Sequence, residues 1–298
     1  MDQPRAEIGV IGGSGLYEMA ELTDVEEALV GTPFGDPSDT IVLGTLSGRR
    51  VAFLPRHGRG HRINPTSIPF RANIFALKSL GVRCILSVSA VGSLKQEIRP
   101  LDMVVPDQII DRTSGRPSTF FSEGLVVHVG FSHPFCGELS ELVYEEAARQ
   151  GVTAHRGGTY VAMEGPQFST VAESELYRSW GASVIGMTAL PEAKLAREAE
   201  TCYAVLACST DYDCWHPEHD TVTADMIIAN LAKNVDHAKS IVRGVVSRVP
   251  NAMSCSCSSA LQSAIVTSPD VIPANVREEL APLIGKYLGA ASTETARR

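Results

Sequence analysis

Arginines and histidines crowd one short loop of the sequence. The segment from Leu54 to Arg62 contains three arginines and two histidines, and its two glycines oppose a stable helix. Arginine binds phosphate through paired hydrogen bonds, and a neighbouring histidine can donate another charge-assisted bond. The loop therefore indicates a phosphate site, a solvated basic loop or a contact with a partner. We expect no metal at His57 and His61, because ligation at this spacing needs a helix.

Two carboxylates follow the most hydrophobic predicted strand, which runs from Thr201 to Ala207. Asp211 and Asp213 are separated by one residue, and alternate residues of extended chain share a face, so both are expected in one pocket. An ionised carboxylate can accept from the exocyclic amino group of adenine, whereas a protonated one can donate to a ring nitrogen. A helix cap or a metal ligand is the alternative. Pro217 lies between His216 and His219, which disfavours metal ligation there.

A glycine-rich turn follows the first predicted strand, Glu7 to Ile11. Residues 12–15 read Gly-Gly-Ser-Gly, and such glycines let backbone N–H groups approach an anion closely. The turn lacks the third glycine of the dinucleotide fingerprint, and no Gly-Lys-Ser/Thr follows it. It indicates either a phosphate-binding turn or an ordinary tight turn.

Small hydroxyl residues and one aromatic residue follow further predicted strands. The strand that begins near Arg83 leads into Ser89 and Gly92, and a second strand leads into Thr188. Ligands of open α/β sheets collect at the carboxyl ends of strands, so these hydroxyls can face a bound anion. Phe168 lies in a turn-forming segment and can either stack on a planar ring or belong to the core.

The elements that must position these residues alternate between strands and helices. This alternation predicts the α/β class, with a mixed sheet that includes an antiparallel hairpin. We predict strands at residues 7–11, 40–46, 50–54, 83–88, 102–105, 159–163, 183–185 and 201–207. We predict helices at residues 69–80, 138–150, 171–180, 191–199, 224–247 and 275–288. Residues 1–298 are expected to form a single domain, with a core of about 7–249 and a loose, serine- and cysteine-containing connector and C-terminal helix at about 250–290.

The composition excludes several classes of function. The 298 residues include 34 acidic and 26 basic side chains, a net charge of -8, without a run of Lys or Arg, which argues against nucleic acid as a partner. The chain has no apolar run of 18 residues and no signal-peptide pattern, so we expect no membrane association and a cytoplasmic protein. Its seven scattered cysteines suit a reducing compartment, and we expect most of them to be core thiols.

Four segments, in this order, closely resemble the trimeric purine nucleoside phosphorylase family. They are Gly12–Leu16, Arg56–Arg59, Glu164–Ser169 and Ser209–Trp215, and the resemblance extends from about Glu7 to Val249. It implies the nucleoside phosphorylase fold, a central, mixed and partly barrel-like sheet flanked by helices. It also implies a homotrimer that needs no metal and no cofactor, with inorganic phosphate as a co-substrate.

The resemblance implies a role for each residue of the site. Phosphate would be held by Ser14, Arg56, His57, Ser89, Ala90 and Thr188. The nucleoside would be bound by Val91, Gly92, Phe168, Ser169, Met187, Asp211, Asp213, Ala224, Ile227, Ile228 and His128, the last from a neighbouring subunit. Asp211 and Asp213 would be catalytic. In relatives that act on 6-oxopurines an Asn stands where this chain has Asp211, so the acid favours a 6-aminopurine.

The same resemblance implies the reaction, phosphorolysis of methylthioadenosine to adenine and 5-methylthioribose 1-phosphate. Phosphate would stabilise the positively charged ribose of the transition state, and Asp211 would protonate N7 of the leaving adenine if burial and Asp213 raise its pKa. Adenosine and methylthioinosine are alternative substrates. Three other functions remain open: a nucleosidase that uses water, a dinucleotide-dependent oxidoreductase and a non-catalytic nucleoside-binding protein.

The segment after residue 250 contains two cysteines separated by one residue. Cys255-Ser256-Cys257 resembles the C-x-C pair of some heat-stable members of the family. A disulfide across a single residue would close a small, strained ring, so we expect free thiols.

Overall fold

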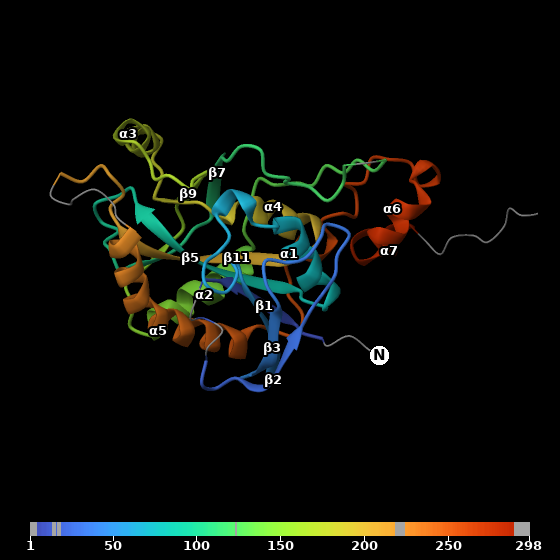
Figure 1. Ribbon diagram of the computed structural model, residues 1–298, viewed down its shortest axis with the longest axis horizontal. Helices are drawn as coiled ribbons and strands as arrows, with labels where there is room; N and C mark the ends of the chain where they lie inside the picture. The colour runs from blue at the N-terminus through green and yellow to red at the C-terminus, as the bar shows by residue number, and fades with distance from the viewer. Residues whose placement is uncertain (1–4, 14–15, 17–18, 123, 218–223, 289–298) are drawn as a thin grey trace, which may run out of the picture.

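The computed structural model describes residues 5–13, 16, 19–122, 124–217 and 224–288, and Figure 1 shows how its strands and helices are arranged. Its sheet has eleven strands. They are β1 (Ile8–Gly12), β2 (Thr23–Ala28), β3 (Ile41–Leu46), β4 (Arg49–Pro55), β5 (Cys84–Ser93), β6 (Met103–Val105), β7 (Gln108–Arg112), β8 (Ala154–Arg156), β9 (Thr159–Met163), β10 (Val184–Gly186) and β11 (Cys202–Asp211).

The sheet branches at the long strand β5. One path runs in the order β2-β3-β4-β1-β5-β10-β9-β7, and a second leaves β5 through β11 to β6 and β8. The strands β1, β4, β5 and β11 are parallel to their neighbours in this set, whereas β3 pairs antiparallel with β4, and β10 with β5. The predicted mixed sheet and its hairpin are therefore confirmed.

Helices cover both faces of this sheet (Figure 1). They are α1 (Phe70–Ser79), α2 (Gly137–Arg149), α3 (Val171–Ser179), α4 (Ala189–Glu198), α5 (Ala224–Arg248), α6 (Ala274–Glu279) and α7 (Ala281–Leu288), with short 3-10 turns η1 (Pro65–Ser67), η2 (Ser256–Ser259) and η3 (Pro269–Val271). The two faces of β11 pack against different helices, which gives one helical layer on each side of the sheet. Tyr203 and Val205 pack in the hydrophobic cluster that includes residues of α1 and α4, while Ala204 and Leu206 pack with α2 and α5. Successive strand residues point to opposite faces, so β11 is buried on both.

Some elements differ from the prediction. The strands β2, β7 and β8 were not predicted as strands; β2 reads Thr-Asp-Val-Glu-Glu-Ala, and only its last residue is buried. Its charge hides the strand because the edge of a sheet does not require apolar residues. The predicted C-terminal helix is wrong as a single element, since it is interrupted at Leu280 between α6 and α7.

The connector after α5 is better packed than its composition indicates. Cys257 and Leu261 are buried, and the Leu261 N–H donates to Glu200 Oε1 at 2.9 Å. Arg83 holds the start of the segment by donating to the Pro250 carbonyl at 2.9 Å. The prediction of a loose connector is wrong for these residues, because its small side chains fit closely against the core. Within the described ranges, no helix is both long and apolar enough to cross a membrane.

Candidate functional site

A cavity of about 930 Å³ lies where the carboxyl-terminal parts of β5 and β11 meet the segments that follow β1, β4 and β10. Crevices at the carboxyl ends of parallel strands are the usual ligand sites of α/β sheets. Of the predicted site residues, the cavity is lined by Arg56, His57, Ser89, Ala90, Val91, Gly92, Phe168, Met187, Thr188, Asp211, Asp213 and Ile228. Residues more than 150 positions apart in the sequence thus face one space.

The other predicted site residues do not line this cavity or cannot be placed. Ser169 lies behind it: its carbonyl accepts from Cys214 Sγ at 3.3 Å, and its hydroxyl faces the Asp213 carboxylate. His128 lies in the segment between β7 and α2. It is exposed and does not line the cavity of its own chain. Ser14 lies outside the described residues, as do the side chains of Ala224 and Ile227.

Arg56 lies at the cavity with a partner that the sequence did not reveal. Its Nε donates to Glu192 Oε1 at 2.5 Å and its Nη2 to Glu192 Oε2 at 3.2 Å, and both side chains are buried. Its Nη1 donates to the Val88 carbonyl at 2.9 Å, and its Nη2 to Ser87 Oγ at 2.6 Å. The paired hydrogen bonds expected for phosphate are therefore made to Glu192. Arg56 can still offer its second Nη1 N–H to a ligand, since no other described residue accepts it.

His57 is held as a neutral imidazole. Its Nδ1 lies 2.9 Å from the carbonyl oxygen of Ile63, which can only accept, so Nδ1 carries the proton. Its ring stacks on that of His61, with centroids 4.2 Å apart. Burial, with the neighbouring Arg56 guanidinium, lowers the pKa of His57 from 6.5 to about 4. The other ring nitrogen, Nε2, therefore keeps a lone pair that can accept a hydrogen bond from a ligand.

Hydroxyl groups accompany His57 at this end of the cavity. Ser89 Oγ is buried and has no hydrogen-bond partner within the described part of the chain. Thr188 is buried at the start of α4, and its hydroxyl does not cap that helix. Tyr160, fully buried, lies against both residues. A buried hydroxyl without a partner is costly, so Ser89 at the cavity wall is available to a ligand that can pair with it.

Asp211 and Asp213 form the opposite end. The Thr210 hydroxyl donates to Asp211 Oδ2 at 2.7 Å, and the Asp213 backbone N–H donates to Asp211 Oδ1 at 2.8 Å. Burial raises the pKa of both carboxyls, Asp213 adds to the rise for Asp211, and the hydrogen bonds oppose it. Both side chains line the cavity, but the expected reason is wrong. The strand ends at Asp211, and Asp213 has a left-handed backbone with φ of 50°, so a turn places it there and not strand alternation.

An apolar wall completes the site. Ile228, Ala232 and Val235 line the cavity from one face of α5, at the spacing of successive helical turns. Phe168 lines the cavity from the segment between β9 and α3 and is 42% exposed, which leaves its ring free to stack. The apolar residues of α5 beyond Ile228 were not predicted as site residues. Apolar side chains at helical spacing occur on any helix that packs against a core, so the pattern does not single out a binding site. Glu192 and Tyr160 carried no signal at all, since burial of a polar side chain is decided by distant segments.

The comparison with known families decides the identity of the fold. The family model described as the phosphorylase superfamily matches residues 7–247. The chain belongs to the phosphorylase superfamily. The matched range contains every residue of the described cavity, so the site is part of the phosphorylase domain.

Relatives of this chain that match most of its length are named as methylthioadenosine phosphorylases. The S-methyl-5'-thioadenosine phosphorylase of Koribacter versatilis (strain Ellin345) is 62% identical over 285 residues, which are 96% of this chain and 98% of the relative. A crystal structure of methylthioadenosine phosphorylase from an antarctic soil metagenomic library is 49% identical, with a TM-score of 0.89, and covers 94% of this chain and 99% of that one. A point mutant of the adenosine/methylthioadenosine phosphorylase of Schistosoma mansoni, in complex with adenine, is 33% identical, with a TM-score of 0.83, and covers 88% of this chain and 99% of that one.

Proposed function

We propose that this protein catalyses the phosphorolysis of S-methyl-5'-thioadenosine to adenine and 5-methylthioribose 1-phosphate, a reaction of methionine and purine salvage. One observation carries the proposal. A single cavity has hydroxyl groups and a neutral imidazole at one end and two buried carboxyl groups at the other. The first set suits a phosphate ion and the second suits a purine with an exocyclic amino group. The names of the relatives, which cover nearly the whole chain, support the same reaction.

At the phosphate end, the chain provides hydrogen bonds and a positive charge. Ser89 and Thr188 donate hydroxyl protons, the Ala90 backbone lies beside them, and Ser14 is proposed to add a further hydroxyl. Arg56 brings one N–H and a charge that Glu192 partly neutralises. His57 Nε2 accepts a hydrogen bond from a phosphate hydroxyl. These groups hold one phosphate oxygen below C1' of the ribose, where its negative charge stabilises the developing positive charge of the sugar.

At the base end, the carboxyl groups manage the leaving adenine. A phosphate oxygen forms the new bond to C1' while the C1'–N9 bond breaks. The electron pair of the C1'–N9 bond passes to the adenine ring. Asp211, whose pKa burial has raised, donates a proton or a strong hydrogen bond to N7. Asp213 accepts from the 6-amino group. Val91, Gly92 and Met187 hold the nucleoside between the two ends, and Phe168 stacks on the base.

The remaining substrate contacts concern the 5' substituent and involve a second subunit. Ile228 and its helical neighbours provide an apolar wall that suits a methylthio group better than a hydroxyl. We propose that Ile227, Ala224 and Ser169 tune this preference, and that His128 of one chain completes the site of its neighbour in a homotrimer. Adenosine or methylthioinosine is the alternative substrate, and the adenosine in the name of the Schistosoma mansoni relative supports adenosine among these.

The proposed reaction uses inorganic phosphate as a co-substrate and needs no cofactor, since every proton transfer and charge is provided by side chains. Nucleic acid and membranes have no part in it. Seven free cysteines suit a reducing compartment, which supports the proposed cytoplasmic location.

The test is the release of adenine from methylthioadenosine by the purified protein, with and without phosphate. The proposal expects release that depends on phosphate, with 5-methylthioribose 1-phosphate as the second product. Release without phosphate would instead identify a nucleosidase and contradict the phosphate assignment. Absence of release under both conditions would contradict the proposed substrate, and a comparison with adenosine and methylthioinosine would then show whether another nucleoside is used.

A further inference from the structure

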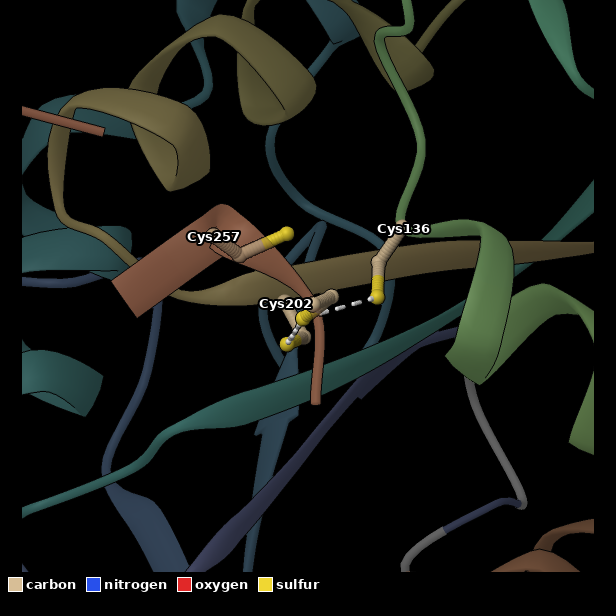
Figure 2. A group of neighbouring side chains, drawn as sticks. Cys136, Cys202 and Cys257 are labelled. Carbon is tan, nitrogen blue, oxygen red and sulfur yellow. Dashed lines mark hydrogen bonds between the residues drawn. The ribbon is translucent and has the colours of Figure 1, made fainter. Parts of the chain in front are cut away.

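Four cysteine thiols converge at the end of the molecule opposite the cavity. The sulfur atoms of Cys136, Cys202, Cys255 and Cys257 all lie within 4.8 Å of one another. Cys255 Sγ is 3.6 Å from Cys136 Sγ and 3.3 Å from Cys202 Sγ. Figure 2 shows Cys136, Cys202 and Cys257 pointing toward a common centre from three separate segments. We call these four residues the thiol cluster; three of them are buried and Cys255 is half-buried.

The spacing of the sulfur atoms matches metal ligation better than disulfides. A disulfide requires about 2.0 Å between its sulfurs. Four thiolates around a tetrahedral zinc ion, at about 2.3 Å from the metal, lie about 3.8 Å from one another. The contacts in the thiol cluster, 3.3 and 3.6 Å with an upper limit of 4.8 Å, lie around that value. Small side-chain movements would therefore be enough to complete a tetrahedron.

Each member of the cluster is held by the fold. Cys136 occupies the N-cap of α2, and its backbone N–H donates to the Tyr203 carbonyl at 2.8 Å. Cys202 is the first residue of β11. The connector brings Cys255 and Cys257, and a Glu138 carboxylate oxygen accepts from the Cys255 N–H at 3.1 Å. A site whose ligands are positioned in advance loses little conformational freedom when it binds a metal.

The surroundings can carry the charge of such a site. A zinc ion with four thiolates has a net charge of -2, and the thiols release their protons when they bind it. The positive end of the α2 dipole lies at Cys136. Arg49 begins β4 and Arg83 directly precedes β5, and they donate to the carbonyls of Val249 and Pro250 at 2.7 and 2.9 Å. The same arginines fix the start of the connector, and their two positive charges exceed the single negative charge of Glu7, with which both pair; Glu138 adds a negative charge beside Cys255.

We propose that the thiol cluster binds one zinc ion, which fastens the connector to the core. Tetrahedral sites with four sulfur ligands select zinc or an iron–sulfur cluster, and a closed site with four cysteines is the common form of structural zinc. Cys202 and Asp211 stand at opposite ends of β11, ten residues long, so the metal and the carboxyl pair are roughly 30 Å apart. The zinc is therefore structural, and this inference does not depend on the proposed reaction.

The test measures metal in the full-length protein. We expect one zinc per chain by elemental mass spectrometry when the protein is purified under reducing conditions and passed over a chelating resin. Cobalt substituted for zinc should give the thiolate-to-metal charge-transfer bands and strong visible absorption of a tetrahedral sulfur site. Cys136→Ser and Cys257→Ser should lose the metal, while Cys214→Ser, which changes a cysteine outside the cluster, should retain it. Removal of the metal by a chelator should lower Tm by at least about 5 °C, and added zinc should restore it.

Two results would overturn the proposal, and neither requires a variant to fold. One is wild-type protein with four titratable thiols in the cluster that takes up no zinc or cobalt. The other is a pair of disulfides among these residues, found by mass spectrometry of the unreduced wild-type protein after growth with zinc. Retention of zinc in both serine variants would also contradict the ligand assignment.

Discussion

Burial acts in opposite directions on the imidazole of His57 and the carboxyl of Asp211. Removal from water disfavours the charged form of either group, so the pKa of His57 falls to about 4 while that of Asp211 rises. Both shifts favour neutral groups: the His57 ring can accept a hydrogen bond, and the Asp211 carboxyl can donate a proton. The proposed reaction uses both groups, because a phosphate hydroxyl needs a hydrogen-bond acceptor at one end of the cavity and adenine gains a proton at the other.

Asp211→Asn tests the proton donor. The amide keeps the size of the carboxyl but cannot transfer a proton, so kcat for methylthioadenosine should fall at least about 100-fold, the usual contribution of a general acid. The KM for phosphate should change little, because the phosphate groups lie at the other end of the cavity. Steady-state kinetics measure both constants. Asp236→Asn, which alters an exposed aspartate of α5, is the matched control. A near-normal kcat in the Asp211 variant would contradict the role.

The low pKa of His57 predicts a pH-dependent stability. Since the folded value of about 4 lies below the ordinary 6.5, the unfolded chain binds the proton more tightly. The stabilising contribution is therefore complete above pH 6.5 and is lost as the pH falls from 6.5 to 4. This loss is of the order of 3 kcal/mol. Urea unfolding at several pH values should show it in the wild type.

The variant His57→Gln isolates this contribution from that of other titrating groups. Its free energy of unfolding should decline less between pH 7 and pH 4 than that of the wild type. Parallel curves for the two proteins over that range would mean that His57 is not buried as a neutral group.

At the scale of elements, the site depends on strands that approach more closely than side chains normally allow. Gly92, near the end of β5, pairs with both Ile185 of β10 and Asp211 of β11. A Cβ atom at this position would lie 2.9 Å from Asp211 Oδ1 and 3.2 Å from Ile185. The absent side chain is what lets the Asp211 carboxylate lie against the strand.

Gly92→Ala should therefore displace Asp211 while the fold persists. We expect kcat to fall by about 10-fold to 100-fold, since small displacements of a catalytic group have effects of this size. The matched control is Gly31→Ala, because a Cβ atom there meets nothing within 4 Å. Far-ultraviolet circular dichroism separates the outcomes. Full activity in a folded Gly92 variant would show that the contact is not needed.

The ion pair of Arg56 and Glu192 joins the end of β4 to α4. Glu192→Ala leaves a buried guanidinium without its carboxylate, and such a loss costs about 3–5 kcal/mol of unfolding free energy. Chemical denaturation measures the change. The control is Glu175→Ala, which removes the exposed ion pair between Glu175 and Arg178 of α3. It should lower the free energy of unfolding by less than about 1 kcal/mol. Similar losses in the two variants would mean that the pair at β4 is open to water.

The elements that build the core could be predicted from the sequence, because their signal is local. The apolar run of β11 and the 3.6-residue period of α5 mark these elements. The described bounds lie within a few residues of the predicted ones, except that β5 extends to Ser93 and β11 to Asp211. The edge strand β2 is charged and gives no such signal. Most candidate site residues were found at strand ends or through motifs. The partner of Arg56 could not be found, since Glu192 lies 136 positions away and only packing brings it there.

The same limit applied to the cysteines. Cys255 and Cys257 stood out as a pair, but their neighbours Cys136 and Cys202 are 119 and 53 positions from Cys255. Spacing along the chain carries no information on such contacts. The expectation of free thiols therefore considered only the strained one-residue ring and missed the four-thiol arrangement.

At the scale of the whole molecule, one strand connects two separate sites. The first residue of β11 belongs to the thiol cluster and its last residue is Asp211. β11 is buried along its entire length between the layer of α1 and α4 and that of α2 and α5. The zinc proposed at one end would hold the connector in place, while the chemistry at the other end depends on residues of the phosphorylase domain alone.

The proposed contribution of His128 to a neighbouring site can be tested directly. His128 is exposed and does not line the cavity of its own chain, although its backbone N–H is fixed by the Ala264 carbonyl at 2.9 Å. If it completes a neighbouring site, His128→Ala should raise the KM for methylthioadenosine and leave the KM for phosphate unchanged, because the phosphate end is built within one chain. The matched control is His133→Ala, an exposed histidine of the same segment. Sedimentation of the wild type at assay concentration should show trimers, and fully active monomers would contradict the shared site, since a single chain would then bind the 5' substituent without His128.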